Sequence, residues 1–552
     1  MTRPAGILVA GAGPAGLTLA LQAHDHGADV RIAERRPAAF RPSRALILHP
    51  RTLEVLRPLG VTQALLDRAE IAPTADLHLG RRATRVSLGD LALPDTAFPH
   101  LTLIRQMDVE AVLSQALADR GVDVERGTEL VTARDGPDGV RAVLQSGGQA
   151  AETLFSSVVG CDGPASTVRS QAGIGWPGGP YPVEVVLADV ELTDDLTADG
   201  THVVAGRDGL VFLFRLGEGA AWRLLATRPA GADQLPFGQP GPRVPAAELQ
   251  ALLDEAGLGV PITDLAWSSR VRLQYRVADR FRQGRLYLAG DAAHAYSPAT
   301  GQGMNAAIQD AANLGWKLAF AGPHPGNTIL LSSYDRERRP VARQVLGMTH
   351  LAFWGEASTG RLAVLLRSKV APLAAPVIPA LMKHRSLVAR GIRVLSQMQV
   401  EYRASPLSVE EKPRSGSGPR AGDRLPDMAV RSAGRSIRLH ELLARPGVHV
   451  LLDRDADRLD TLALGPLVHM HRLTSRPGRG LITVRPDGYI GFRCEAAEED
   501  QLAAWLSLAG VTVSRGGGGG PRARSCVTGN LTASDGNSLP FATLCMSGES
   551  WP

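Results

Sequence analysis

The chain has 552 residues, of which 44% are hydrophobic, so it is long enough for about three domains of roughly 150 residues each. Its formal net charge is +5, but the cations are spread along the chain and almost all are arginines, which argues against a basic nucleic-acid-binding patch. The four cysteines, Cys161, Cys494, Cys526 and Cys545, have no CxxC or zinc-ligand spacing. Composition therefore excludes a disulfide scaffold and indicates no metal site.

The apolar stretch at the N-terminus is interrupted by glycines and lacks the cleavage pattern of a signal peptide. No other run reaches the length of a membrane span, which is about 18 apolar residues. We therefore expect a cytoplasmic protein with neither a membrane nor a nucleic-acid partner.

Residues 6 to 34 predict a strand, a glycine-rich turn, a helix and a second strand, the usual opening of a parallel sheet. In the turn "GAGPAG", Gly11 permits a tight bend, Gly13 lets a pyrophosphate approach the backbone, and Gly16 lets the helix pack on the strand. Glu34 ends the second strand, where a carboxylate accepts ribose hydroxyls and repels a 2′-phosphate. This spacing predicts NAD or FAD rather than NADP, without separating the first two.

The next segments indicate two further kinds of structure. Residues 105 to 121 have helical spacing, and short apolar strands follow them. Between about residues 181 and 281, period-two segments predict an antiparallel sheet inserted into the first domain. Residues 346 to 402 are mainly helical in pattern, and a Pro/Gly/Ser-rich linker then leads to a small α/β unit.

A second glycine-rich segment, residues 284 to 319, indicates which of the two cofactors, FAD or NAD, the chain binds. Its apolar strand ends at Gly290 and Asp291, and a helix is predicted to begin near Asn305. A carboxylate at the end of such a strand can accept hydrogen bonds from the ribityl chain of a flavin. The N-terminus of the helix favours the negative charge of a reduced flavin. The segment therefore favours FAD.

Three motifs together, "GAGPAG", "CDGPASTVR" and "GDAAHAYSPATGQGMN", resemble those of class A flavoprotein monooxygenases, the para-hydroxybenzoate hydroxylase-like family, in its aromatic polyketide hydroxylase branch. The resemblance implies an α/β fold: a Rossmann-like FAD-binding domain, an inserted and mainly antiparallel β-sheet substrate domain, and a C-terminal thioredoxin-like α/β domain. The last domain has no CxxC pair, so we expect it to serve packing rather than redox chemistry. The expected boundaries are 1–70, 102–180 and 281–402 for the FAD-binding domain with a helical extension, 71–101 and 181–280 for the substrate domain, 403–420 for a linker, 421–511 for the thioredoxin-like domain and 512–552 for a disordered tail.

The resemblance also implies a set of site residues. Arg44 lies beside the flavin and Pro298 lines the wall over its reactive carbon, so both are candidate catalytic residues. Arg169 belongs to the second motif. His294 belongs to the third motif, where we expect it to support the loop rather than to take part in catalysis. The implied cofactor-binding residues are Gly11, Gly13, Ala15, Gly16, Glu34, Arg35, Arg44, Gln106, Asp162, Gly290, Asp291, Pro298, Gly301, Gly303, Met304 and Asn305.

By the same resemblance, the enzyme would use FAD, reduced by NADPH or NADH, to hydroxylate a phenolic or quinone-type polycyclic aromatic polyketide through a flavin C4a-hydroperoxide. The substrate, with dioxygen, would bind between the flavin and apolar strands that include Val211 to Phe214; core packing is the alternative role for these side chains. Two other functions stay open: Baeyer–Villiger oxygen insertion into a similar polyketide, and a non-oxygenase flavin dehydrogenase. A monomer or homodimer is expected.

Overall fold

The chain folds into two compact units, the first comprising Met1–Val400, Pro426–Ala429 and Ile437–Pro446, and the second comprising Glu401–Leu425, Val430–Ser436 and Gly447–Pro552. The computed structural model describes residues 4–39, 46–71, 73–79, 82–87, 89, 91–193, 200–205, 209–215, 222–230, 241–298, 301–322, 328–357, 365, 384–411, 418–432, 434–453, 462–475, 480–495 and 499–515.

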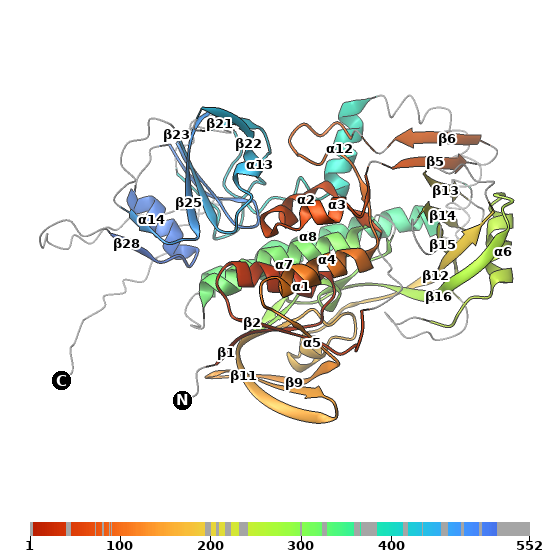
Figure 1. Ribbon diagram of the computed structural model, residues 1–552, viewed down its shortest axis with the longest axis horizontal. Coiled ribbons are helices and arrows are strands. Elements are labelled where there is room, and N and C mark those ends of the chain that lie inside the picture. Colours follow the sequence, from red (N-terminus) through yellow and green to blue (C-terminus); the bar gives the residue numbers. More distant parts are fainter. Residues whose placement is uncertain are drawn as a thin grey trace, which may run out of the picture. The chain divides into compact units, whose positions relative to one another are not determined.

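The first unit contains a mainly parallel sheet built on the N-terminal βαβ segment, as predicted (Figure 1). Strand β1 (Ala5–Ala10) lies between β2 (Val30–Glu34) and β11 (Gln149–Gly160), parallel to both. The remaining strands are β8 (Val124–Arg126), β18 (Leu286–Leu288), β17 (Arg282–Gln283) and the antiparallel pair β9 (Thr128–Gly136) and β10 (Gly139–Ser146). Because the inner strands are almost wholly apolar, they are buried between the helices that cover them.

Helices connect and flank this sheet, and α1 packs against both α4 and α7, while α7 packs against α8. Their bounds are α1 Pro14–Asp25, α2 Pro50–Leu56, α3 Thr62–Leu66, α4 Gln106–Ala118, α5 Thr167–Gln171, α7 Gln302–Ala321, α8 Thr328–Ala357 and α12 Arg385–Leu395. A small sheet joins β3 (Ile47–Leu48), β7 (Thr102–Leu103) and β4 (Glu70–Ile71). Among the described helices, none is both long and apolar enough to cross a membrane.

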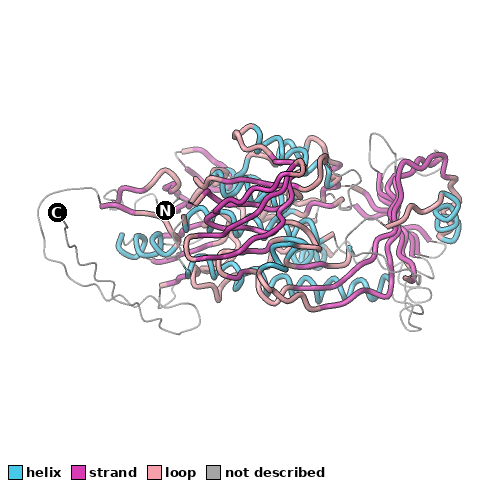
Figure 2. The backbone as a smooth tube through the Cα atoms, turned by 90° about the horizontal axis from the view of Figure 1, so that it is seen from below, coloured by secondary structure: helices cyan, strands magenta, loops and turns pink. Residues whose placement is uncertain are grey.

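A mainly antiparallel sheet forms a second part of the first unit, as the period-two pattern predicts, and Figure 2 shows its strands gathered at the right of the view beside α6 (Ala246–Glu255). One face packs on α6 and the other carries a second apolar cluster. The strand order is β19 (His294–Ala295), β16 (Ile262–Val277), β12 (Gly178–Leu192), β15 (Trp222–Pro229), β14 (Leu210–Arg215), β13 (Thr201–Ala205), β5 (Thr74–Leu79) and β6 (Arg82–Ser87). Strand β5 pairs in parallel with β13, which brings a segment from early in the chain into this sheet.

The second unit is built on a sheet whose order is β20 (Val409–Glu410), β27 (Ile490–Cys494), β26 (Leu481–Val484), β23 (Val448–Asp453), β25 (Val468–Ser475), β21 (Ala429–Ser432) and β22 (Arg435–Arg438). The other elements of this unit are α14 (Glu499–Leu508) and the pair β24 (Leu462–Leu464) and β28 (Val513–Arg515), whereas α13 (Leu439–Leu442) belongs to the first unit.

Two expected boundaries are wrong at their edges. Residues 403–411 of the predicted linker belong to the fold, because β20 pairs with β27 and the Trp505 indole donates to the Leu407 carbonyl at 2.9 Å. Residues 513–515 of the predicted tail form β28, which pairs with β24. Short pairings of this kind satisfy backbone groups without leaving a periodic apolar pattern in the sequence.

Candidate functional site

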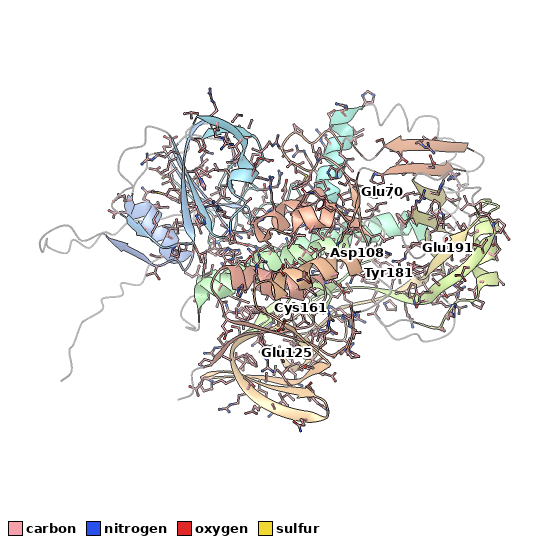
Figure 3. All side chains as sticks on the ribbon, viewed as in Figure 1. Glu70, Asp108, Glu125, Cys161, Tyr181 and Glu191 are labelled. Atoms are coloured by element: carbon pink, nitrogen blue, oxygen red, sulfur yellow. The ribbon has the colours of Figure 1, made fainter. Side chains whose placement is uncertain are left out.

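A cavity of about 490 Å³ joins the two sheets of the first unit. Figure 3 labels Cys161, which follows β11 of the parallel sheet and lines the cavity, and Tyr181, which lies on β12 of the antiparallel sheet. The cavity is lined by the carboxyl ends of parallel strands, by the first turns of α1 and α7, and by side chains of β14, β15 and β16. An open α/β sheet binds its ligands at this position, outside the carboxyl ends of its strands.

The glycine turn after β1 forms one wall. Gly11 has a φ of 100°, and a Cβ atom there would overlap the Cys161 carbonyl oxygen. Gly13 lines the cavity as the extended N-cap of α1, has no side-chain cap, and a Cβ atom on it would have no protein atom within 4 Å. Ala15 also lines the cavity. Open space before uncapped N–H groups is what a pyrophosphate needs.

Gly16 has the packing role that its place in the turn predicts. It does not line the cavity, and a Cβ atom on it would overlap the carbonyl oxygen of Gly11. Gly16 therefore lets the helix pack closely on the turn, and its expected contact with the cofactor stays a prediction.

Glu34 lies at the end of β2, in the wall of the cavity, and is 4% exposed. Its carboxylate accepts hydrogen bonds from the backbone N–H of Ala12 at 2.9 Å and from Arg36 Nε at 2.7 Å. Burial alone would raise the pKa of Glu34, but Arg36 and the backbone amides outweigh it and lower the pKa. A carboxylate that stays ionised is therefore held beside the glycine turn, and Arg35 lines the cavity next to it.

Asp162, after β11, also lines the cavity. Its Oδ2 atom accepts hydrogen bonds from the N–H groups of Thr167 at 2.7 Å and Val168 at 3.2 Å. Its Oδ1 atom is buried and accepts no hydrogen bond from the described residues. Burial raises the pKa of Asp162, although Ser166 and backbone amides partly offset it.

Two further side chains support these walls. Gln106 begins α4 and lines the cavity, with its Nε2 donating to Glu110 Oε1 at 2.8 Å. Arg169 does not line the cavity; it donates to the carbonyls of Ala292 at 2.9 Å and Pro164 at 2.7 Å. Arg169 therefore ties the second motif to the third.

The third motif begins in a short 3-10 turn, Gly290–Ala292, whose exposed Asp291 lines the cavity. Gly290 itself does not line the cavity; its φ is 63°, and a Cβ atom there would lie 3.1 Å from the Cβ atoms of Ala15 and Ala307. Glycine at this position lets the strand end, α1 and α7 converge behind Asp291.

A buried ion network stands behind this loop. Asp310 of α7 accepts hydrogen bonds from His294 Nε2 at 2.5 Å and Arg338 Nε at 2.6 Å, and all three side chains are 1% exposed. Burial opposes ionisation of Asp310, but Arg338 and His294 lower its pKa. His294 does not line the cavity, whereas Tyr296, stacked on it with ring centroids 4.6 Å apart, does. Tyr296 belongs to the third motif, but sequence reasoning assigned it no role, because the resemblance implied none for an aromatic residue at that position.

The first turn of α7 forms another wall. The helix begins at Gln302 rather than near Asn305, and its N-cap Gly301 is left-handed, with a φ of 62°. Gly301, Gly303 and Met304 line the cavity. The sequence does not mark the first residue of this helix, because its N-cap is a glycine and not one of the side chains that usually cap a helix.

Asn305 does not line the cavity, and its expected contact with the cofactor stays a prediction. Its Oδ1 atom accepts hydrogen bonds from the His49 N–H at 2.9 Å and Thr52 Oγ1 at 2.7 Å, and its Nδ2 donates to the carbonyls of Ile47 and Gly301. Because both the oxygen and the nitrogen of its side-chain amide are hydrogen-bonded within the protein, Asn305 positions the first turn of α7 against residues 47–52.

The two candidate catalytic residues differ in what the structure says of them. Pro298 is exposed and lines the cavity between the loop of the third motif and α7. Arg44 lies outside the described residues, so its role stays a prediction.

The antiparallel sheet supplies the apolar end of the cavity, where Phe214, Leu225, Val271 and Leu273 line the wall. Phe214 comes from the predicted segment, but Val211 and Leu213 of the same strand lie in the core under α6. Side chains alternate between the faces of a strand, so both predicted roles occur along β14.

These features fit a protein that binds a dinucleotide beside an apolar cavity. Comparison with known proteins agrees. The family model described as "FAD binding domain" matches residues 5–349, and that described as "Aromatic-ring hydroxylase, C-terminal" matches residues 418–509.

The chain is 32% identical over 538 residues to 6-methylpretetramide 4-monooxygenase of Streptomyces rimosus, covering 91% of this chain and 92% of the relative. It is 30% identical to the rifampicin monooxygenase of Streptomyces venezuelae, covering 91% and 99%. Among solved structures, it is similar to the anhydrotetracycline hydroxylase of Streptomyces rimosus, with a TM-score of 0.69, 27% identity and coverage of 92% and 99%.

The chain belongs to the FAD-binding domain family, and it is a flavin-dependent monooxygenase of the aromatic-ring hydroxylase type.

Proposed function

We propose that this enzyme consumes NADPH or NADH and dioxygen to hydroxylate a phenolic or quinone-type polycyclic aromatic substrate. The observation that carries the proposal is one continuous cavity, which has nucleotide-binding groups at one end and an apolar wall at the other. A cofactor and a substrate held in the same cavity can react with less exposure to bulk water.

FAD fits the polar end of the cavity. The open space before Gly13 suits its diphosphate, the ionised Glu34 suits the adenosine ribose, and Asp291 suits the ribityl chain. When bound there, FAD would supply the reduction of dioxygen and the delivery of one oxygen atom to the substrate.

The chain's own part is to bind, to orient and to exclude water. Phe214, Leu225 and Val271 present an apolar wall that would bury a flat, fused-ring substrate and fix which edge meets the cofactor. Pro298, which is rigid and has no N–H donor, lines the cavity between the two ends.

The substrate class draws support from the relatives, whose names give 6-methylpretetramide, rifampicin and anhydrotetracycline as substrates. We propose hydroxylation of a polyketide of this size, with Baeyer–Villiger insertion as the alternative outcome on the same substrate. Cytoplasmic location and a monomeric or homodimeric state stay predictions.

The test is oxidation of NADPH and of NADH by the FAD-loaded protein, measured together with oxygen consumption. Anhydrotetracycline, other fused-ring phenols and single-ring phenols would serve as probes. We expect a fused-ring phenol to accelerate both rates by more than about tenfold, because bound substrate commits the cofactor to reduction. No acceleration across the panel, with FAD bound, would point instead to a flavin dehydrogenase or to a redox-inert flavoprotein. A solved Diels-Alderase of pyrroindomycin biosynthesis, with a TM-score of 0.70 and 28% identity, makes that outcome worth testing.

A further inference from the structure

A buried pair of glutamines connects the first turn of α7 to the end of α12. Gln302 is 0% exposed, and its Nε2 donates a hydrogen bond to the Leu395 carbonyl. Its Oε1 accepts a hydrogen bond from Gln397 Nε2 at 2.7 Å, and Gln397 is 2% exposed. The two residues are 95 positions apart, so the pair is a tertiary contact.

Gln397 adopts a backbone conformation that glutamine disfavours. Its φ is 57°, and among the described residues the only other non-glycine residue with a positive φ is Ala92, at 53°. A left-handed conformation strains a residue that has a Cβ atom and persists only where its surroundings require it. Packing is one such requirement, since Ala92 and the neighbour of Gln397, Met398, belong to one small apolar cluster.

The end of α12 is a second requirement, because the N–H groups of Gln397 and Met398 donate to the carbonyls of Val394 and Arg393, and a helix that ends in this way takes a left-handed residue. The side-chain hydrogen bond to Gln302 is separate from this backbone conformation, and it acts on the cavity. Gln302 begins α7, between the lining residues Gly301 and Gly303. The N–H groups of a first helical turn have no partner within the helix, so their direction decides what they can bind. The Asn305 amide holds this turn to residues 47–52 from one side, and the Gln302–Gln397 pair holds it to residues 395–397 from another.

We propose that Gln302 and Gln397 are positioning residues, whose amide pair fixes the first turn of α7 in the orientation that receives FAD. The inference rests on the proposed binding of FAD in this cavity. It assigns a function to the end of α12, which lies far along the chain from the nucleotide-binding motifs and does not line the cavity.

The test compares two substitutions that place glycine at the two strained positions of the full-length protein. Gln397→Gly relaxes the backbone and removes the amide pair, whereas Ala92→Gly relaxes the backbone in the same cluster and leaves the pair intact. Gln397→Leu removes the amide while keeping the side-chain bulk and the strain. Each variant would be titrated with FAD by flavin fluorescence, and the absorbance spectrum of the bound flavin would be recorded at saturation.

We expect Gln397→Gly and Gln397→Leu to raise the FAD dissociation constant by about three- to tenfold, which is the effect of losing about one buried hydrogen bond. Both variants should also shift the spectrum of the bound flavin. Ala92→Gly should keep the wild-type dissociation constant and spectrum. If Gln397→Leu fails to fold, the glycine pair still decides the question.

A wild-type dissociation constant and spectrum in Gln397→Gly would overturn the proposal, as would equal changes in Gln397→Gly and Ala92→Gly, which would assign the effect to the apolar cluster. Failure of the wild-type protein to bind FAD would instead contradict the proposed function.

Discussion

The two ends of the cavity are built on different principles. The nucleotide end is made of backbone: strand ends, helix N-termini and glycines whose missing Cβ atoms leave room for a ligand, together with the carboxylates of Glu34, Asp162 and Asp291. The substrate end is made of side chains from the middle of strands, such as Phe214 and Leu225. Backbone geometry tolerates few residue types, whereas an apolar wall accepts many. One end therefore specifies a cofactor, and the other leaves the substrate free to vary.

The largest expected effect separates the two faces of β14. Leu213→Ala should lower the free energy of unfolding by about 2–5 kcal/mol, because it leaves a cavity in a fully buried cluster. Phe214→Ala should cost much less stability but raise the KM for the aromatic substrate, because it opens the cavity wall. Chemical denaturation and steady-state kinetics of both variants would measure this contrast. A similar loss of stability with an unchanged KM in Phe214→Ala would assign that side chain to the core.

The next effect contrasts two glycines of the same turn. Gly16→Ala should destabilise the protein by about 1–3 kcal/mol, since its Cβ atom would overlap the backbone of Gly11. Gly13→Ala should fold normally but bind FAD weakly, because its Cβ atom would project where no protein atom lies within 4 Å. Thermal unfolding and FAD titration would distinguish them. Normal FAD affinity in Gly13→Ala would show that the diphosphate does not approach this turn.

A third prediction concerns the acidic group at the end of β18. Asp291→Ala should raise the FAD dissociation constant by about 10- to 100-fold, the usual value of hydrogen bonds to a charged acceptor. Its stability without FAD should change little, because Asp291 is exposed. Asp310→Ala is the matched control: it removes a buried carboxylate that does not line the cavity, so stability should fall even in the absence of FAD. Unchanged flavin content in Asp291→Ala would remove this residue from the site.

The smallest effect is the pH dependence of Glu34, whose pKa is lower in the folded protein than in the unfolded chain. Its contribution to stability is complete above the ordinary glutamate pKa and is lost as the pH falls through the lowered value. Glu34→Gln should therefore be less stable than the wild type at pH 6 and converge with it as the pH falls below the lowered pKa of Glu34. A difference that grows on acidification would reverse the sign of the pKa shift.

The same contrast explains what the sequence could predict. Gly11, Gly13, Glu34 and Asp291 follow from rules on turns and strand ends, and all four line the cavity. Gly16 and Asn305 belong to the same motifs, but spacing alone cannot tell a ligand contact from a residue that supports one.

The missed features depend on tertiary structure. Gln397 gives no local signal, because its bond to Gln302 joins residues 95 positions apart. The sequence could not show that Leu213 faces the core and Phe214 faces the cavity, because both faces of β14 are apolar. Strand β20 has two residues, too few for a period-two pattern to reveal.

Product analysis under labelled dioxygen tests most directly whether the two ends of this cavity work together. The FAD-loaded enzyme would be supplied with NADPH or NADH, a fused-ring phenol that stimulates its oxidation, and ¹⁸O₂, and the product would be identified by mass spectrometry. The account predicts a product with an intact ring system and one labelled oxygen atom, formed more slowly by Phe214→Ala. A product without labelled oxygen would contradict a monooxygenase reaction in this cavity.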